Sequence, residues 1–98
     1  HYNLLTPLNS PGVFLEEGFA YIDSLLAWCK ANSMYLILDL HCAPGGQNAE
    51  GISDYMGFPS LWESRYNQER TVELWGEIAR RYVNEEWIGG YDHILSCR

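Results

Sequence analysis

Hydrophobic positions in the first third of the chain recur with the period of an α-helix. They are Leu15, Phe19, Ile22, Leu26 and Cys29. Glutamates begin this segment and Lys30 lies near its end, which complements the helix dipole. The pattern predicts a helix over residues 15–31, with Cys29 as a small core residue and Asn32 as a left-handed stop.

A run of apolar residues follows at positions 34–40, and it is apolar on both faces. Such a run is typical of a strand that is covered on both sides in a parallel sheet, so a strand is predicted at 35–41. Because side chains alternate along a strand, Asp39 and His41 share one face at its carboxyl end.

A second helical pattern predicts a helix over residues 64–83. Ser60 and Glu63 have the spacing of a capping box before it. The predicted buried stripe is Val72, Trp75, Ala79 and Tyr82. Glu77 and Arg81 form a favourable i,i+4 pair, and the acidic run Glu69, Glu73 and Glu77 is interpreted as a solvated face.

Three other segments complete the predicted order. Residues 1–5 read as the tail of a strand, residues 42–59 as a long Gly- and Pro-containing loop, and residues 91–95 as a strand after a turn at 84–90. The order of strand, helix, strand, loop, helix and strand indicates an α/β chain with parallel strands and right-handed crossovers.

Composition excludes several partners. The 98 residues have 6 Lys and Arg against 13 Asp and Glu, a net charge of −7. This balance argues against nucleic acid and anionic membrane surfaces, both of which attract basic residues. No apolar stretch approaches the ~20 residues of a membrane span. The three cysteines form no metal-binding pattern, and neither a metal nor a cofactor is expected.

The strongest chemical signal is His41, which ends a predicted buried strand just before a polar loop. Ligands of α/β sheets and barrels bind at the carboxyl ends of strands. The alternative is that His41 only bonds nearby backbone. The Pro44-Gly45-Gly46 segment lacks a phosphate-binding pattern, and the adjacent His41 and Cys42 point to opposite sides, which disfavours chelation.

Four ordered segments together resemble glycoside hydrolase family 5, the cellulase-type enzymes. They are LDLHCAPGGQN at 38–48, DSLLAWCKAN at 23–32, SLWES at 60–64 and WIGGYD at 87–92. The resemblance implies a (β/α)8 TIM barrel that cleaves β-glucans with retention. The whole chain, 1–98, would be one fragment of that barrel domain, about two βα units from the end of strand two to strand four.

The resemblance also implies the site residues. His41 would lie in the subsite beside the scissile bond. The candidate substrate-binding residues are His41, Gln47, Asn48, Trp62 and Tyr2. Ser96 stands where the family has its acid/base glutamate, and the nucleophile strand lies beyond Arg98. A serine cannot act as a carboxylic acid toward a glycosidic oxygen, so the isolated chain is expected to be inactive.

Alternatives stay open at this point. Glu50 and Asp54 could replace the missing carboxylates, although flexible surface carboxylates are a poor substitute. The chain could be a non-catalytic carbohydrate binder, with Tyr55 as an additional wall, or a fragment that self-associates through exposed strand edges. The departure from the family after Asp92 indicates a truncated or frame-shifted end. The compartment is unknown, although family members are usually secreted or in the cell envelope.

Overall fold

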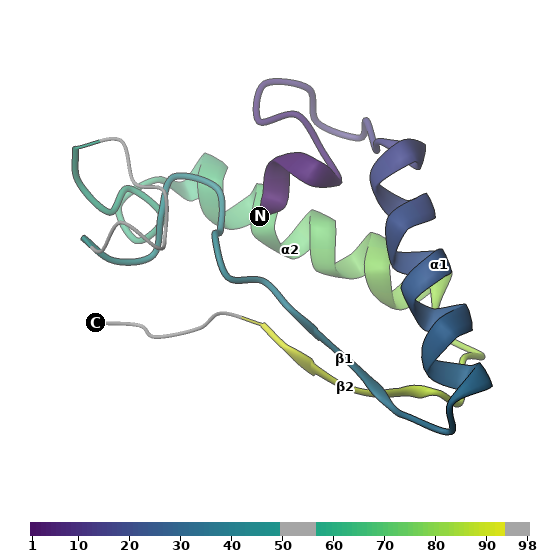
Figure 1. Cartoon of the computed structure of the whole chain (residues 1–98). Coiled ribbons are helices and arrows are strands. Elements are labelled where there is room, and N and C mark those ends of the chain that lie inside the picture. The colour runs from purple at the N-terminus through teal and green to yellow at the C-terminus, as the bar shows by residue number, and fades with distance from the viewer. Residues whose placement is uncertain (50–56, 94–98) are drawn as a thin grey trace.

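Two parallel strands are connected through a helix in the computed structural model, which describes residues 1–49 and 57–93. The elements are η1 (Tyr2–Leu4), α1 (Glu16–Ala31), β1 (Leu36–Asp39), α2 (Arg65–Arg81) and β2 (Ile88–Asp92). Figure 1 shows both helices on one side of the strand pair, with both strands running the same way. The predicted parallel arrangement and mixed α/β class are confirmed. No helix of the described residues has the length and apolarity to cross a membrane.

The register of the strand pair places β2 earlier in the chain than predicted. Leu36 pairs with Ile88, Leu38 with Tyr91 and Asp39 with Asp92, and an irregularity falls between Leu36 and Ile37. The prediction that residues 84–90 only turn the chain was wrong for its last part, because Gly89 and Gly90 lie within β2. Pairing with β1 extends the strand through these glycines despite their low strand propensity. Residues 94 and 95 lie outside the described part.

The first helix agrees with its predicted bounds, and its Cys29 is half-buried. The predicted stop was wrong in detail: Asn32 has a φ of −107°, and the left-handed residue is Ser33, with a φ of 55°. Asn32 caps the helix instead through its side-chain amide, which donates to the carbonyl of Trp28 at 2.8 Å. Gly18 allows η1 to approach α1, because a Cβ there would lie 1.9 Å from the Leu4 carbonyl oxygen.

The predicted strand tail at residues 1–5 was also wrong, because this segment forms the 3-10 helix η1. The N–H groups of Leu4 and Leu5 donate to the carbonyls of His1 and Tyr2, and the imidazole of His1 accepts from the N–H of Asn3. These local bonds occupy the donors that a strand ladder would use. The N–H of Tyr2 donates to the Cys42 carbonyl at 3.0 Å, which connects this segment to the residues after β1.

The predicted capping box at Ser60 and Glu63 was wrong, because α2 begins at Arg65, four positions later than an N-cap at Ser60 implies. Its N-cap is Ser64, whose hydroxyl accepts from the N–H of Asn67, while Ser60 bonds the loop described below. The predicted stripe was wrong at Val72 and Ala79, which are exposed, whereas Trp75 is half-buried and Tyr82 is buried, as predicted. The buried helix residues are Asn67, Arg70, Thr71, Leu74 and Ile78. Three of these five side chains are polar.

The acidic run of α2 is not a uniformly solvated face. Glu69 is exposed, as predicted, and it pairs with Arg65. Glu73 instead accepts from the N–H of Gly12 and from Arg70. Glu77 pairs with Arg80 and with Arg81, the second of these being the predicted i,i+4 pair.

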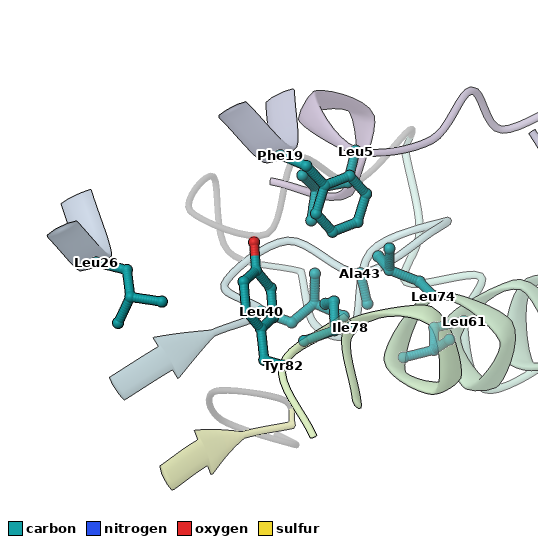
Figure 2. Packing of buried hydrophobic residues seen from close by; sticks show 9 residues of the cluster. All are labelled: Leu5, Phe19, Leu26, Leu40, Ala43, Leu61, Leu74, Ile78 and Tyr82. Atoms are coloured by element: carbon teal, nitrogen blue, oxygen red, sulfur yellow. The ribbon is translucent and has the colours of Figure 1, made fainter. Parts of the chain in front are cut away.

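The core lies between the helices and one face of β1. Figure 2 shows its nine buried residues, which come from the N-terminal segment, both helices, the end of β1 and the following loops: Leu5, Phe19, Leu26, Leu40, Ala43, Leu61, Leu74, Ile78 and Tyr82. Leu36 and Leu38 pack against this cluster. The opposite face of β1 is open, with Ile37 64% exposed, so the prediction of cover on both faces is wrong for the described residues.

Candidate functional site

The carboxyl end of β1 presents a carboxylate and an imidazole to solvent. Leu40 is buried toward the helices, and Asp39 and His41 lie on the opposite face, as the alternation predicted. Their Oδ2 and Nδ1 atoms are 3.0 Å apart, and both side chains are more than a third exposed. In the imidazole tautomer that donates from Nδ1 to this carboxylate, Nε2 is left to accept a hydrogen bond from a ligand hydroxyl.

A second carboxylate lies at the same edge. Asp92 is the register partner of Asp39, and paired residues of parallel strands share a face. Tyr91 packs toward the core, against the edge of the Trp75 ring, which leaves Asp92 on the face of Asp39. Over residues 1–49 and 57–93, no group of three or more His, Cys, Asp or Glu side chains is placed to hold a metal ion.

The loop after β1 is anchored by Gln47, whose side chain is 1% exposed. Its Oε1 accepts from the N–H of Ala43 at 3.1 Å, and its Nε2 donates to the carbonyl of His41 at 2.5 Å. The amide therefore bridges two backbone groups at the strand end. Asn48 is buried beside it.

A close contact with the start of α2 fixes the middle of the same loop. The Ser60 hydroxyl donates to the Gly45 carbonyl at 3.0 Å, and the Asn67 amide donates to that hydroxyl at 3.2 Å. Gly45 has a φ of +82°, and a Cβ there would lie 2.3 Å from Nδ2 of Asn67. Only glycine satisfies both the left-handed conformation and the close approach.

An exposed indole lies next to this loop. Trp62 is 48% exposed, and its N–H donates to the Gln47 carbonyl at 2.5 Å. Phe58, four positions earlier, is also exposed. Sequence reasoning did not select Phe58, although an aromatic residue between Gly57 and Pro59 in a polar loop was a usable signal. Aromatic rings of this kind suit stacking against apolar ligand faces.

The five predicted binding residues differ in how accessible their side chains are to a ligand. Hydrogen bonds connect three of them, Trp62 to Gln47 and Gln47 to His41, and the N–H of Tyr2 donates to the carbonyl of Cys42, the residue after His41. The rings of His41 and Trp62 are accessible, and the Tyr2 ring is half-buried and 4.9 Å from that of His1. The remaining two, Gln47 and Asn48, are buried. Several other candidates lie outside the described residues: Glu50, Asp54, Tyr55 and Ser96.

No protein-family model matches the chain. Over 84 residues it is 39% identical to a beta-xylosidase of Phanerodontia chrysosporium, covering 85% of this chain and 18% of that protein. It is 36% identical over 84 residues to endoglucanase C of Acetivibrio thermocellus, covering 86% and 23%. It is 31% identical over 72 residues to a probable glucan 1,3-beta-glucosidase A of Aspergillus clavatus, covering 74% and 17%.

These relatives are much longer than this chain, which spans about a fifth of their length. The similar region includes most of the 98 residues. The chain is therefore a homologue of one segment of several proteins named as glycosidases.

Proposed function

We propose that this chain is the segment from the end of strand two to strand four of a family 5 glycoside hydrolase barrel, and that it binds β-glucan at the carboxyl end of β1. The observation that carries the proposal is the accessible pair of Asp39 and His41 at the end of a parallel strand. This is the edge at which barrel enzymes bind ligands. The names of the relatives support glycosidase chemistry for the whole protein.

The faces of the strand pair support a barrel origin. In a (β/α)8 barrel, helices cover the outer face of the strands, and the inner face points to the barrel interior. Here the helices cover the face of Leu36 and Leu38, and Ile37 and Asp39 lie on the other face. The open face of β1 then corresponds to the barrel interior, and His41 extends it to the rim.

The chemistry of the whole protein would be retaining hydrolysis by two carboxyl groups about 5–5.5 Å apart. This chain would supply His41 and Trp62 to the substrate cleft, with the imidazole accepting from a sugar hydroxyl and the indole stacking on a sugar ring. In this assignment Ser96 would stand at the acid/base position. We therefore propose that the isolated chain binds oligosaccharide without cleaving it.

Binding of three defined probes tests this function: cellohexaose, laminarihexaose and xylohexaose, titrated by isothermal calorimetry. We expect one of them to bind, and we expect His41→Ala and Trp62→Ala to weaken that binding at least about tenfold, or about 1.4 kcal/mol. Trp28→Ala is the matched control, because Trp28 is 66% exposed but lies on α1. The proposal fails if no probe binds, or if Trp28→Ala weakens binding as much as Trp62→Ala.

A second role is supported by a different observation. Ile37 and Tyr35 are exposed on and beside β1, and each strand of the described sheet pairs along one edge only. Unpaired strand edges and apolar sheet faces favour association with another chain. We propose a second copy as the partner of the isolated chain, and the test of that proposal is given in the Discussion.

A further inference from the structure

We infer that Gln47 is a positioning residue, which holds both His41 and Trp62 in place and does not itself contact the sugar. This inference rests on the proposed function, because it concerns the same site. It assigns a role to a residue that the sequence placed among the substrate contacts.

Both ends of the Gln47 side-chain amide form hydrogen bonds with backbone groups. Gln47 accepts from the N–H of Ala43 through Oε1 and donates to the carbonyl of His41 through Nε2. A primary amide has the acceptor and the donor that this bridge requires, and a carboxylate lacks the donor. At 1% exposure the side chain has almost no surface with which to meet a ligand.

Gln47 is hydrogen-bonded to both residues that carry the accessible rings, His41 and Trp62. The side chain of Gln47 bonds the backbone of His41, whose ring is further held by Asp39. The main-chain carbonyl of Gln47 accepts from the indole N–H of Trp62. The separation between the imidazole and the indole is thus set through Gln47, and binding groups need fixed relative positions to act on one ligand.

The discriminating variant is Gln47→Glu, which keeps the size of the side chain. Its carboxylate still accepts from Ala43 but faces the carbonyl oxygen of His41 without a donor. We expect oligosaccharide binding to weaken about tenfold, the fold-change that corresponds to the loss of one buried hydrogen bond. Asn84→Asp is the matched control, an amide-to-acid change at an exposed turn after α2, and it should bind like the parent.

A readout without sugar separates positioning from contact. In ¹H–¹⁵N spectra of the free protein, Gln47→Glu should shift the signals of the Ala43 amide and the Trp62 indole, and the Trp28 indole should stay in place. In the parent, the Trp62 indole hydrogen should exchange more slowly than that of Trp28, and this measurement needs no variant to fold.

Each outcome is informative. If the parent binds sugar and Gln47→Glu loses binding while the free-state signals of Ala43 and Trp62 are unchanged, Gln47 is a direct contact and the inference is wrong. Equal binding by Gln47→Glu and the parent also overturns it. If the parent binds none of the three probes, the proposed function fails, whereas slow exchange of the Trp62 indole would still establish its hydrogen bond to the Gln47 carbonyl.

Discussion

The guanidinium of Arg70 donates a 2.6 Å hydrogen bond to the hydroxyl of Thr6, across most of the chain. Arg70 is 2% exposed, and it also donates to the carbonyls of Pro7 and Leu8 and pairs with Glu73. A buried cation needs such partners, since an unpaired charge away from water is costly. Arg70 therefore connects the segment after η1 to α2 through hydrogen bonds.

Removing this guanidinium should destabilise the fold strongly. We expect Arg70→Met to lower the free energy of unfolding by about 3 kcal/mol, because the buried acceptors lose their donor. In a chain of this size, that loss lowers Tm by more than about 10 °C. Thermal unfolding followed by circular dichroism measures it. Arg65→Met is the control, because its pair with Glu69 is exposed, and an equal loss there would contradict the argument.

The same residue explains why the buried face of α2 was only partly predicted. The predicted stripe followed the wrong face in part, because it included the exposed Val72 and Ala79 and missed the buried, apolar Leu74 and Ile78. Hydropathy periodicity selects apolar side chains, so it also passed over Arg70 and Asn67. Those two are buried because tertiary hydrogen bonds compensate their polarity. Their partners lie in other segments, and periodicity within one helix holds no information about them.

The strands show a similar division. Strict alternation predicted the face shared by Asp39 and His41, because that depends only on local geometry. The start of β2 depended on pairing with β1, which overrides the turn propensity of Gly89 and Gly90. In the site, a Gly- and Pro-rich loop after the strand was predictable. The burial of Gln47 was not, because its partners are backbone groups whose positions depend on the loop conformation.

The ion pairs of Glu77 within α2 should make the stability of the fold sensitive to acid. Hydrogen bonds from Arg80, and then from Arg81, hold the pKa of Glu77 below its ordinary value. A lowered pKa means that the stabilisation is present above the unfolded-state pKa of about 4.3 and is lost as pH falls through the folded-state value. We expect Tm to decline below about pH 4.3, and Glu77→Gln to lower Tm at pH 7 and flatten the decline.

Glu69→Gln is the matched control for that experiment. Glu69 forms the same type of intrahelical pair, with Arg65, but on the exposed face of α2. The Glu69→Gln variant should change Tm little, both at pH 7 and below about pH 4.3. If Glu77→Gln retains the full acid-dependent decline of the parent, the pairs of Glu77 do not account for acid sensitivity.

Hydrolysis by the isolated chain should stay at background. We expect no release of reducing sugar from soluble β-glucan, because Ser96 cannot donate the proton that a glutamate would. The alternative is catalysis by Glu50 with Asp54. Turnover that persists in Ser96→Ala and disappears in Glu50→Ala would support that alternative and contradict the site assignment.

Association of the isolated chain should depend on the open face of β1. Burying Ile37 against a second copy removes apolar surface from water, which favours the dimer. The net charge of −7 opposes it, and added salt screens this repulsion. Sedimentation equilibrium at micromolar protein should therefore detect a dimer or larger species, and its fraction should rise with salt.

The variant Ile37→Lys separates apolar association from the effect of charge. It places a charged group on the open face, so the dimer should weaken. Val72→Lys makes the same change of net charge on α2, at a residue that is 72% exposed. Association of this variant should increase slightly, because its net negative charge is smaller in magnitude. A sharply unfolding monomer at every concentration and salt would refute self-association. An equal loss in both variants would show that another surface of the chain joins the copies.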